Sequence, residues 1–217
     1  MRRNLILFDL DGTLTDPFEG ITKSMQHALR HFGIHEDNAD NLKRFIGPPL
    51  RTVFLEYGVP LPQCEEAVAV FRERFGTVGL YENVLYDGVV PLLAFLKEKG
   101  YILAIASSKA EFYVKKIAEH FKIAAYFAFI GGAEMDGRRS EKADVIRYVM
   151  ASLGAGGADR AYMVGDREHD ILSAQKAGII SIGVLYGYGG AQELTAAGAS
   201  HIIESVAGLI EFFGKPK

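Results

Sequence analysis

Two pairs of aspartates have the types and spacing that suit a bound cation. Asp9 and Asp11 follow the apolar run at residues 5–8, and residues i and i+2 of an extended chain point to the same side. Asp166 and Asp170 lie in an acidic loop after a later apolar run, and carboxylate oxygens are ligands that Mg²⁺ accepts. Capping of the next helix is the alternative for the second pair. The aspartates therefore predict a site for a hard cation.

Hydroxyl and ammonium groups that suit a phosphate follow other apolar runs. Ser107 and Ser108 come after residues 101–106, where we expect a helix start with backbone N–H groups that favour an anion. Lys142 begins another expected helix, a position where the macrodipole disfavours a cation. One Mg²⁺ ion and the Lys142 ammonium would neutralise the three charges of the ionised Asp9, Asp166 and Asp170. A phosphate dianion then becomes an acceptable ligand.

The elements that must position these residues alternate between strand and helix patterns. Short apolar runs predict strands at residues 5–8, 101–106, 125–130, 161–164, 179–184 and 201–203. Helical periodicity lies between them, at residues 89–99, 111–121, 142–153 and 170–177. Such alternation predicts a doubly wound parallel sheet of the α/β class, in which ligands bind beyond the carboxyl ends of the strands.

The segment from residue 16 to residue 85 interrupts this alternation. It carries helical patterns at residues 21–32, 39–45, 50–57 and 65–76, without a convincing strand. We therefore expect a catalytic core at residues 1–15 and 86–217 and an inserted helical cap domain at residues 16–85. The glycine-rich stretch 154–157 predicts a flexible loop.

Composition excludes several classes of protein. The 217 residues include 24 Lys and Arg against 27 Asp and Glu, for a net charge of −3. No global positive field attracts nucleic acid. The single Cys64 forms no internal disulfide and is expected as a small buried hydrophobe. No apolar run is long enough to span a membrane. A cytoplasmic protein, monomeric or homodimeric, is expected.

The chemical residues together resemble the motifs of one family. Asp9-Leu10-Asp11-Gly12-Thr13, Ser107, Lys142 and Gly165-Asp166 with Asp170 occur in the order and at the strand ends of four motifs. The chain resembles the haloacid dehalogenase-like hydrolases, specifically the phosphatases similar to phosphoglycolate phosphatase and bacterial 5'-nucleotidases. This resemblance implies a Rossmann-like core with a small inserted helical cap.

The resemblance also implies roles for individual residues. Asp9 would be the nucleophile that forms an aspartyl-phosphate, and Asp11 would be the general acid and base. Magnesium would be held by Asp9, by the backbone carbonyl of Asp11 and by Asp166, with Asp170 acting through water or an intervening residue. The groups expected to hold the phosphoryl group and the rest of the substrate are Thr13, Ser107, Ser108, Lys142 and Arg44.

Three neighbouring features have competing interpretations. Lys109 is a second candidate for the phosphate-binding lysine, but we prefer Lys142 and expect Lys109 to be solvated at a helix start. His169 is expected to be exposed, because an oxygen-rich magnesium site does not require imidazole. The glycine-rich segment 184–190 resembles a loop that these phosphatases carry, and we expect a structural role for it.

The expected substrate is a small phosphorylated metabolite, either phosphoglycolate or a nucleoside 5'-monophosphate. In the cap, Arg44, like Lys43 and Arg51, could recognise a carboxylate or second phosphate, or be an ordinary solvated charge. The aromatic residues Phe18, Phe45 and Phe54 offer either a stacking surface or core packing. A carboxylate at Asp11 argues against dehalogenases and ion-pumping ATPases of the family, which lack it. A phosphosugar mutase and a non-catalytic regulatory protein are the alternatives. A phosphoprotein phosphatase is disfavoured, because an inserted cap restricts access by a folded protein partner.

Overall fold

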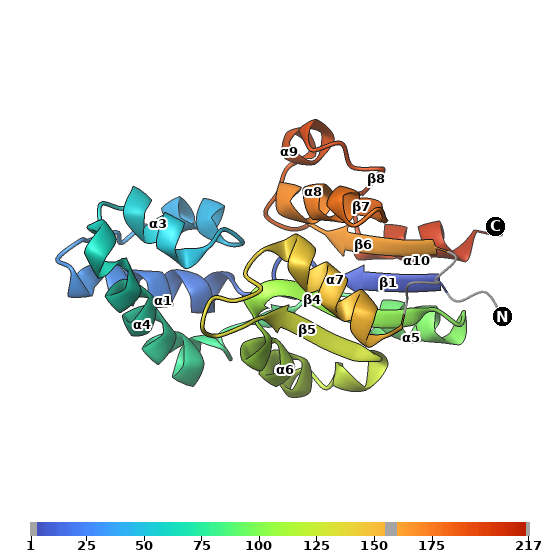
Figure 1. Cartoon of the computed structure of the whole chain (residues 1–217), viewed down its shortest axis with the longest axis horizontal. Coiled ribbons are helices and arrows are strands. Elements are labelled where there is room, and N and C mark those ends of the chain that lie inside the picture. Colours follow the sequence, from blue (N-terminus) through green and yellow to red (C-terminus); the bar gives the residue numbers. More distant parts are fainter. Residues whose placement is uncertain (1–3, 155–159, 216–217) are drawn as a thin grey trace. The chain divides into compact units, whose positions relative to one another are not determined.

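The computed structural model describes residues 4–154 and 160–215, and its contacts divide the chain into two compact units (Figure 1). The larger unit consists of Met1–Asp16 and Leu85–Lys217, and the smaller unit of Pro17–Val84. Apart from Gly154, the stretch 154–157 expected as a flexible loop lies outside the described residues. Within the part of the chain described, no helix combines the length and apolarity needed to cross a membrane.

A parallel six-stranded sheet forms the centre of the larger unit. Its strands are β1 (Asn4–Phe8), β4 (Ile102–Ala110), β5 (Phe129–Ala133), β6 (Arg160–Gly165), β7 (Ile180–Val184) and β8 (His201–Ile203). They lie in the order β5-β4-β1-β6-β7-β8, and every neighbouring pair is parallel. The α/β class with a doubly wound parallel sheet, expected from the sequence, is confirmed.

Strand β1 lies at the point where the strand order changes direction. It pairs with β4 on one side and with β6 on the other. Its residues Leu5, Ile6, Leu7 and Phe8 are at most 1% exposed, as expected for a strand with both faces covered. A switch point of this kind opens a crevice beyond the carboxyl ends of the strands, and β1 delivers the first aspartates to it.

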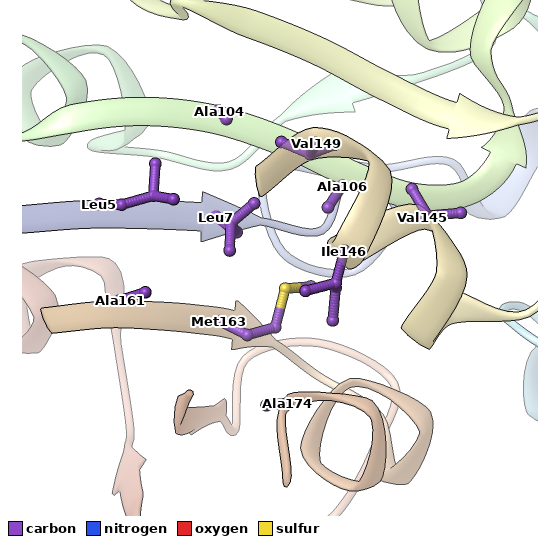
Figure 2. Close-up of a cluster of buried hydrophobic side chains, with 10 residues drawn as sticks. All are labelled: Leu5, Leu7, Ala104, Ala106, Val145, Ile146, Val149, Ala161, Met163 and Ala174. Atoms are coloured by element: carbon purple, nitrogen blue, oxygen red, sulfur yellow. The ribbon is translucent and has the colours of Figure 1, made fainter. Parts of the chain in front are cut away.

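Helices pack on this sheet and form the hydrophobic core of the larger unit together with it. They are α5 (Val89–Glu98), α6 (Glu111–His120), α7 (Lys142–Ser152), α8 (Glu168–Lys176), α9 (Ala191–Ala196) and α10 (Val206–Gly214). Figure 2 shows Val145, Ile146 and Val149 of α7 in one buried cluster with side chains of β1, β4 and β6. Their complete burial fixes the first turn of α7 near the carboxyl edge of the sheet.

Two strands differ from the expected ranges. Strand β4 continues through Ser107 and Lys109 to Ala110, with a register shift against β5 between Ala106 and Ala110. The expected strand at residues 125–130 is instead a turn of 3₁₀ helix, η4 (Ala124–Tyr126), followed by β5 at residues 129–133. A short apolar run does not distinguish strand from helical turn, and alanine in the first half of this run favours the turn.

The smaller unit is helical. Its elements are α1 (Phe18–His31), α2 (Ala39–Leu42), η1 (Lys43–Phe45), α3 (Leu50–Glu56), η2 (Leu61–Gln63), α4 (Cys64–Arg74) and the π-helical turn η3 (Phe75–Gly79). Phe45, Phe54 and Cys64 are buried, which favours core packing over a stacking surface for the two aromatic residues. Where the chain passes between the units, β2 (Thr15–Asp16) and β3 (Val84–Leu85) form a two-stranded sheet that the sequence pattern did not reveal.

Candidate active site

The loop after β1 turns tightly and carries Asp9 and Asp11. The Gly12 N–H donates to the Thr15 carbonyl at 2.7 Å, and the Leu14 N–H donates to the Leu10 carbonyl at 2.9 Å. Gly12 has a φ of +81°, and a Cβ there would lie 2.2 Å from Asp166 Oδ2. Only glycine meets both conditions. The local sequence thus brings the first aspartates against the loop that follows β6.

Three aspartates meet at this edge of the sheet. Asp9, Asp166 and Asp170 each place one carboxylate oxygen within 4.8 Å of the others. Asp166 directly follows β6, and Asp170 lies in the first turn of α8. Both are almost completely buried, whereas the Asp9 side chain is 14% exposed. Three carboxylates held together by three separate elements form an oxygen-rich site that suits a divalent cation.

Lys142, the first residue of α7, lies among these carboxylates. Its Nζ atom is 2.8 Å from Asp9 Oδ1 and 2.8 Å from Asp170 Oδ1. Burial by itself would lower the pKa of Lys142, but the charges of Asp170 and Asp9 together raise it above its ordinary value. The ammonium therefore stays charged and holds the Asp9 carboxylate in place. This contact accounts for a cation at the start of a helix, where the dipole alone disfavours it.

Asp166 has one oxygen that is hydrogen-bonded and one that is not. The Oδ2 atom of Asp166 accepts a hydrogen bond from the Tyr188 N–H at 2.7 Å. The Oδ1 atom is buried and has no hydrogen-bond partner among the described residues. Burial, followed by the charges of Asp170 and Asp9, raises the pKa of Asp166 well above its ordinary value. A buried oxygen without a donor is costly. A cation at Oδ1 would remove that cost, so the residues present fit a metal ion.

Asp170 combines the two interpretations that the sequence left open. Its Oδ2 atom accepts a hydrogen bond from the Arg167 N–H at 3.1 Å, which caps α8, while Oδ1 faces Lys142. Burial raises the pKa of this carboxyl, and the ammonium of Lys142 opposes the rise. Helix capping and membership of the acidic cluster are therefore both served by one side chain.

The structure corrects the expectation that Lys109 is solvated. Its Nζ atom lies 2.6 Å from Asp11 Oδ2, and the two side chains are 10% and 12% exposed. The reason is that β4 does not end at Ala106, so Lys109 extends along the crevice instead of starting a helix in solvent. Burial raises the pKa of Asp11, and Lys109 is the largest influence that lowers it.

The expected phosphate-binding hydroxyls have unequal environments. Ser107 is 2% exposed, and its Oγ atom accepts a hydrogen bond from the Lys109 N–H at 3.3 Å. Thr13 is fully buried, and within the described residues its hydroxyl has no hydrogen-bond partner. Ser108 is exposed. These serines lie within β4 and not at a helix start, since α6 begins at Glu111, so the expected helix N-terminus does not serve them.

Arg44, which was predicted to bind substrate, and His169, which was expected to be exposed, are not part of the acidic cluster. Arg44 is an exposed residue of the smaller unit, with its guanidinium carbon 4.4 Å from the centre of the Phe45 ring. It lines a hollow of about 490 Å³ together with three acidic side chains, those of Glu36, Asp40 and Glu56. His169 is exposed and is not part of the acidic cluster.

Residues of the loop after β7 also contact the site, and sequence reasoning gave them only a structural role. Besides the Tyr188 N–H on Asp166, the Tyr186 hydroxyl donates to the Thr13 carbonyl at 3.0 Å. Glu193 accepts hydrogen bonds from Arg167 Nε at 2.8 Å and from the Glu168 N–H at 2.9 Å. The glycines at positions 187, 189 and 190 were the available signal, because they indicate close backbone approach.

Comparisons with known proteins define the class to which this fold and site belong. The family model described as haloacid dehalogenase-like hydrolase matches residues 6–184. A predicted phosphatase from Clostridium acetobutylicum has a solved structure that superposes with a TM-score of 0.93, at 45% identity and 98% coverage of each chain. The chain therefore belongs to the haloacid dehalogenase-like hydrolase family.

Two curated relatives carry more specific names. The chain is 45% identical to a 5'-nucleotidase of Pseudomonas aeruginosa, over 94% of this chain and 92% of the relative. It is also 41% identical to the tyrosine-protein kinase PtkA of Mycobacterium tuberculosis, over 85% of this chain and 63% of the kinase. This chain thus matches less than two thirds of the length of the kinase.

Proposed function

We propose that this chain is a magnesium-dependent phosphatase that hydrolyses a small phosphomonoester through an aspartyl-phosphate on Asp9. The observation that carries the proposal is the cluster of Asp9, Asp166 and Asp170 around the Lys142 ammonium, with Asp11 two residues from the proposed nucleophile. The names of the relatives, a 5'-nucleotidase and a predicted phosphatase, support phosphoester hydrolysis.

The metal ligands that we propose are Asp9, Asp166, Asp170 and the backbone carbonyl of Asp11. The unpartnered Oδ1 atom of Asp166 and the convergence of three carboxylates support this assignment. The Asp11 carboxylate is not part of that cluster, which is consistent with a role for its backbone instead. Magnesium, when bound there, supplies a positive charge that lowers the repulsion between the carboxylates and the phosphate dianion.

Asp9 is the nucleophile in this proposal. Its carboxylate oxygen forms a bond to phosphorus as the ester oxygen leaves, and Asp11 donates a proton to that leaving oxygen. In the second step a water oxygen attacks phosphorus, Asp11 accepts a water proton, and the bond from phosphorus to Asp9 breaks. Lys142 orients the nucleophile through the contact of its Nζ atom with Asp9 Oδ1 at 2.8 Å. The raised pKa of Asp11 favours the protonated form that the first step needs.

The phosphoryl oxygens are held by the ammonium of Lys142 and by hydroxyl groups. Ser107 and Thr13 are buried, and in this proposal their hydroxyls face the phosphoryl oxygens. Ser108 is exposed and contributes through its backbone N–H. The spread negative charge of the transferring group is stabilised by these fixed donors.

The smaller helical unit is the proposed cap, and it provides specificity. Arg44 of that unit is the residue that we propose to contact a carboxylate or a second phosphate, although Glu36, Asp40 and Glu56 line the same hollow. We favour a nucleoside 5'-monophosphate over phosphoglycolate, and the similarity to the 5'-nucleotidase of Pseudomonas aeruginosa supports this order.

A second candidate is phosphoryl transfer to an acceptor hydroxyl instead of water. The similarity to the tyrosine-protein kinase PtkA favours this candidate. The chemistry differs only in the attacking oxygen, because the same Asp11 carboxylate would accept the proton of either acceptor. A tyrosine-containing peptide added to the hydrolysis assay separates the two: transfer appears as phosphopeptide, and hydrolysis as free phosphate.

Phosphate release from a panel of compounds tests the proposal. The panel holds nucleoside 5'-monophosphates, phosphoglycolate, sugar phosphates and pyrophosphate, each with magnesium or with EDTA. We expect magnesium-dependent release from one class, and a loss of at least about a thousandfold in Asp9→Asn. The matched control is Asp144→Asn, because Asp144 is an exposed carboxylate of α7 that pairs with Arg147. Folded protein that releases no phosphate from any compound overturns the proposal.

A further inference from the structure

The loop at residues 185–190, between β7 and α9, contacts more of the larger unit than the proposed chemistry uses. It contacts Asp166, the loop after β1 and the segments through which the chain passes to and from the smaller unit. A loop that only closes the fold would not need side chains directed at all of these.

The contact with Asp166 fixes the orientation of its carboxylate. The Tyr188 N–H donates to Oδ2 at 2.7 Å, and the buried Oδ1 has no hydrogen-bond partner among the described residues. The backbone of the loop lies directly against that of Asp166, since a Cβ at Gly189 would be 1.9 Å from the Asp166 carbonyl oxygen. A displacement of the loop therefore displaces Asp166.

The contact with Asp16 ties the same tyrosine to the outgoing connection. The Tyr188 hydroxyl donates a hydrogen bond to Asp16 Oδ1. Asp16 is the last residue of the larger unit before the chain enters the smaller one, and it lies in β2. Burial, followed by the hydrogen bond to Asp16, raises the pKa of Tyr188, so the phenol remains a donor at all physiological pH values.

The neighbouring tyrosine contacts the returning connection. The ring of Tyr186 packs edge-on against Tyr86, with 5.1 Å between the ring centres, and Tyr86 directly follows β3. The Tyr86 N–H donates to the Leu14 carbonyl at 3.1 Å. The loop thus touches both segments that join the units, in addition to one carboxylate of the acidic cluster.

We propose that Tyr188 is a positioning residue that couples Asp166 to Asp16, so that the affinity of the acidic cluster for magnesium depends on the connection between the two units. The assignment of magnesium rests on the proposed function. In this proposal Tyr188 touches neither the metal nor the substrate. Its backbone N–H binds the proposed ligand Asp166. Its phenol binds Asp16, in the segment that any movement of the smaller unit must involve.

Magnesium titration by calorimetry tests the coupling without substrate. Tyr188→Phe keeps the ring and the backbone N–H but removes the bond to Asp16, and Asp16→Ala removes the same bond from the other side. We expect each variant to weaken magnesium binding by about tenfold, as loss of support behind a ligand does. The double variant should be no weaker than either single variant. Asp16→Asn keeps an acceptor oxygen and should bind nearly as the wild type does.

The matched control is Tyr126→Phe, which removes a phenol from the half-buried turn η4 of the same unit. It should leave magnesium affinity unchanged. For substrates that turn over, kcat/KM of Tyr188→Phe should fall at low magnesium and recover at saturating magnesium, a recovery that general loss of structure would not produce.

Wild-type magnesium affinity in both Tyr188→Phe and Asp16→Ala overturns the coupling, as do fully additive effects in the double variant. A wild-type chain that binds no magnesium overturns it too. Magnesium binding without release of phosphate from any phosphoester contradicts the proposed function alone, because the calorimetric comparison of the variants still measures the coupling.

Discussion

Lys142 and Lys109 neutralise different carboxylates of the site. Lys142 lies between Asp9 and Asp170, and Lys109 pairs with Asp11. The contact of Lys142 with Asp9 orients the proposed nucleophile. The contact of Lys109 acts on Asp11, which must donate a proton in the first step and accept one in the second. Because opposite charges within a few ångströms lower the pKa of a carboxyl, Lys109 sets the balance between the two forms of Asp11.

Replacing Lys109 should shift the pH dependence of the reaction. Asp11 must carry a proton when the leaving oxygen departs, so the rate falls as pH rises through its pKa. Lys109 lowers that pKa against the effect of burial, and Lys109→Met therefore raises it. We expect the alkaline limb of the kcat/KM profile to move to higher pH. Lys115→Met, which removes an exposed pair with Glu111, should leave the limb in place. If the alkaline limb of Lys109→Met does not move, or moves to lower pH, Lys109 does not lower the pKa of Asp11 in the way described.

At the residue scale, the sequence predicted the acidic cluster but not its supports. Asp9, Asp166 and Asp170 were found because each follows a recognisable strand or begins a helix. The Lys109–Asp11 pair was missed because a register shift keeps β4 extended beyond its apolar run. Tyr188 was missed because its contact with Asp166 is made by the backbone. A backbone contact between distant segments does not require a particular type of side chain.

Helix α7 is the element that joins the core to the chemistry. Its first residue is Lys142, and its buried face packs on β4 and β5 and on α8. Three of its side chains contribute to one cluster with Leu5, Leu7 and Met163 (Figure 2). The stability of this packing holds the ammonium in the crevice.

A cavity in the packing of α7 should cost stability. Ile146 is fully buried in that cluster, and Ile146→Ala should lower the free energy of unfolding by about 3 kcal/mol, within the range for such truncations. Denaturant titration followed by circular dichroism measures the change. Arg147→Ala on the exposed face should alter it by less than about 0.5 kcal/mol. Equal effects of the two substitutions would argue against the packing described.

Element boundaries mark the limit of prediction at this scale. Helices α5, α6 and α7 begin where the periodicity placed them, because amphipathic patterns persist over several turns. The predicted boundaries of β5 were wrong, because the apolar run at residues 125–130 covers most of the turn η4 and only the start of the strand. The two-residue strands β2 and β3 are too short to give any periodic signal.

At the scale of the whole molecule, the acidic cluster makes stability depend on both magnesium and pH. Burial, together with repulsion from neighbouring carboxylates, raises the pKa values of Asp166 and Asp170, although Lys142 opposes the rise at Asp170. An acid with a raised pKa in the folded state is destabilising when ionised, so the metal-free protein loses stability as pH rises from the ordinary value of 3.8 toward the raised values. Magnesium requires the ionised carboxylates, and its stabilising effect therefore grows over the same range.

Thermal unfolding with and without magnesium measures this linkage. At a magnesium concentration about 100 times the dissociation constant, the stabilisation is about 2.7 kcal/mol, or roughly 5–10 °C in Tm for a chain of this size. The shift should be smaller at pH 5 than at pH 7.5, and it should be lost in Asp166→Ala. An equal shift at both pH values, or one that survives the substitution, would place the metal elsewhere.

The most direct measurement of the central claim is capture of the phosphoryl group on Asp9. Asp11→Asn lacks the base that hydrolyses the intermediate, and p-nitrophenyl phosphate has a leaving group that needs no proton. We expect a burst of p-nitrophenolate in the presence of magnesium and, after acid quench and mass spectrometry, one phosphoryl group on Asp9. Release of phosphate by this variant with Asp9 unmodified throughout the time course, together with retained turnover in Asp9→Asn, would contradict the account.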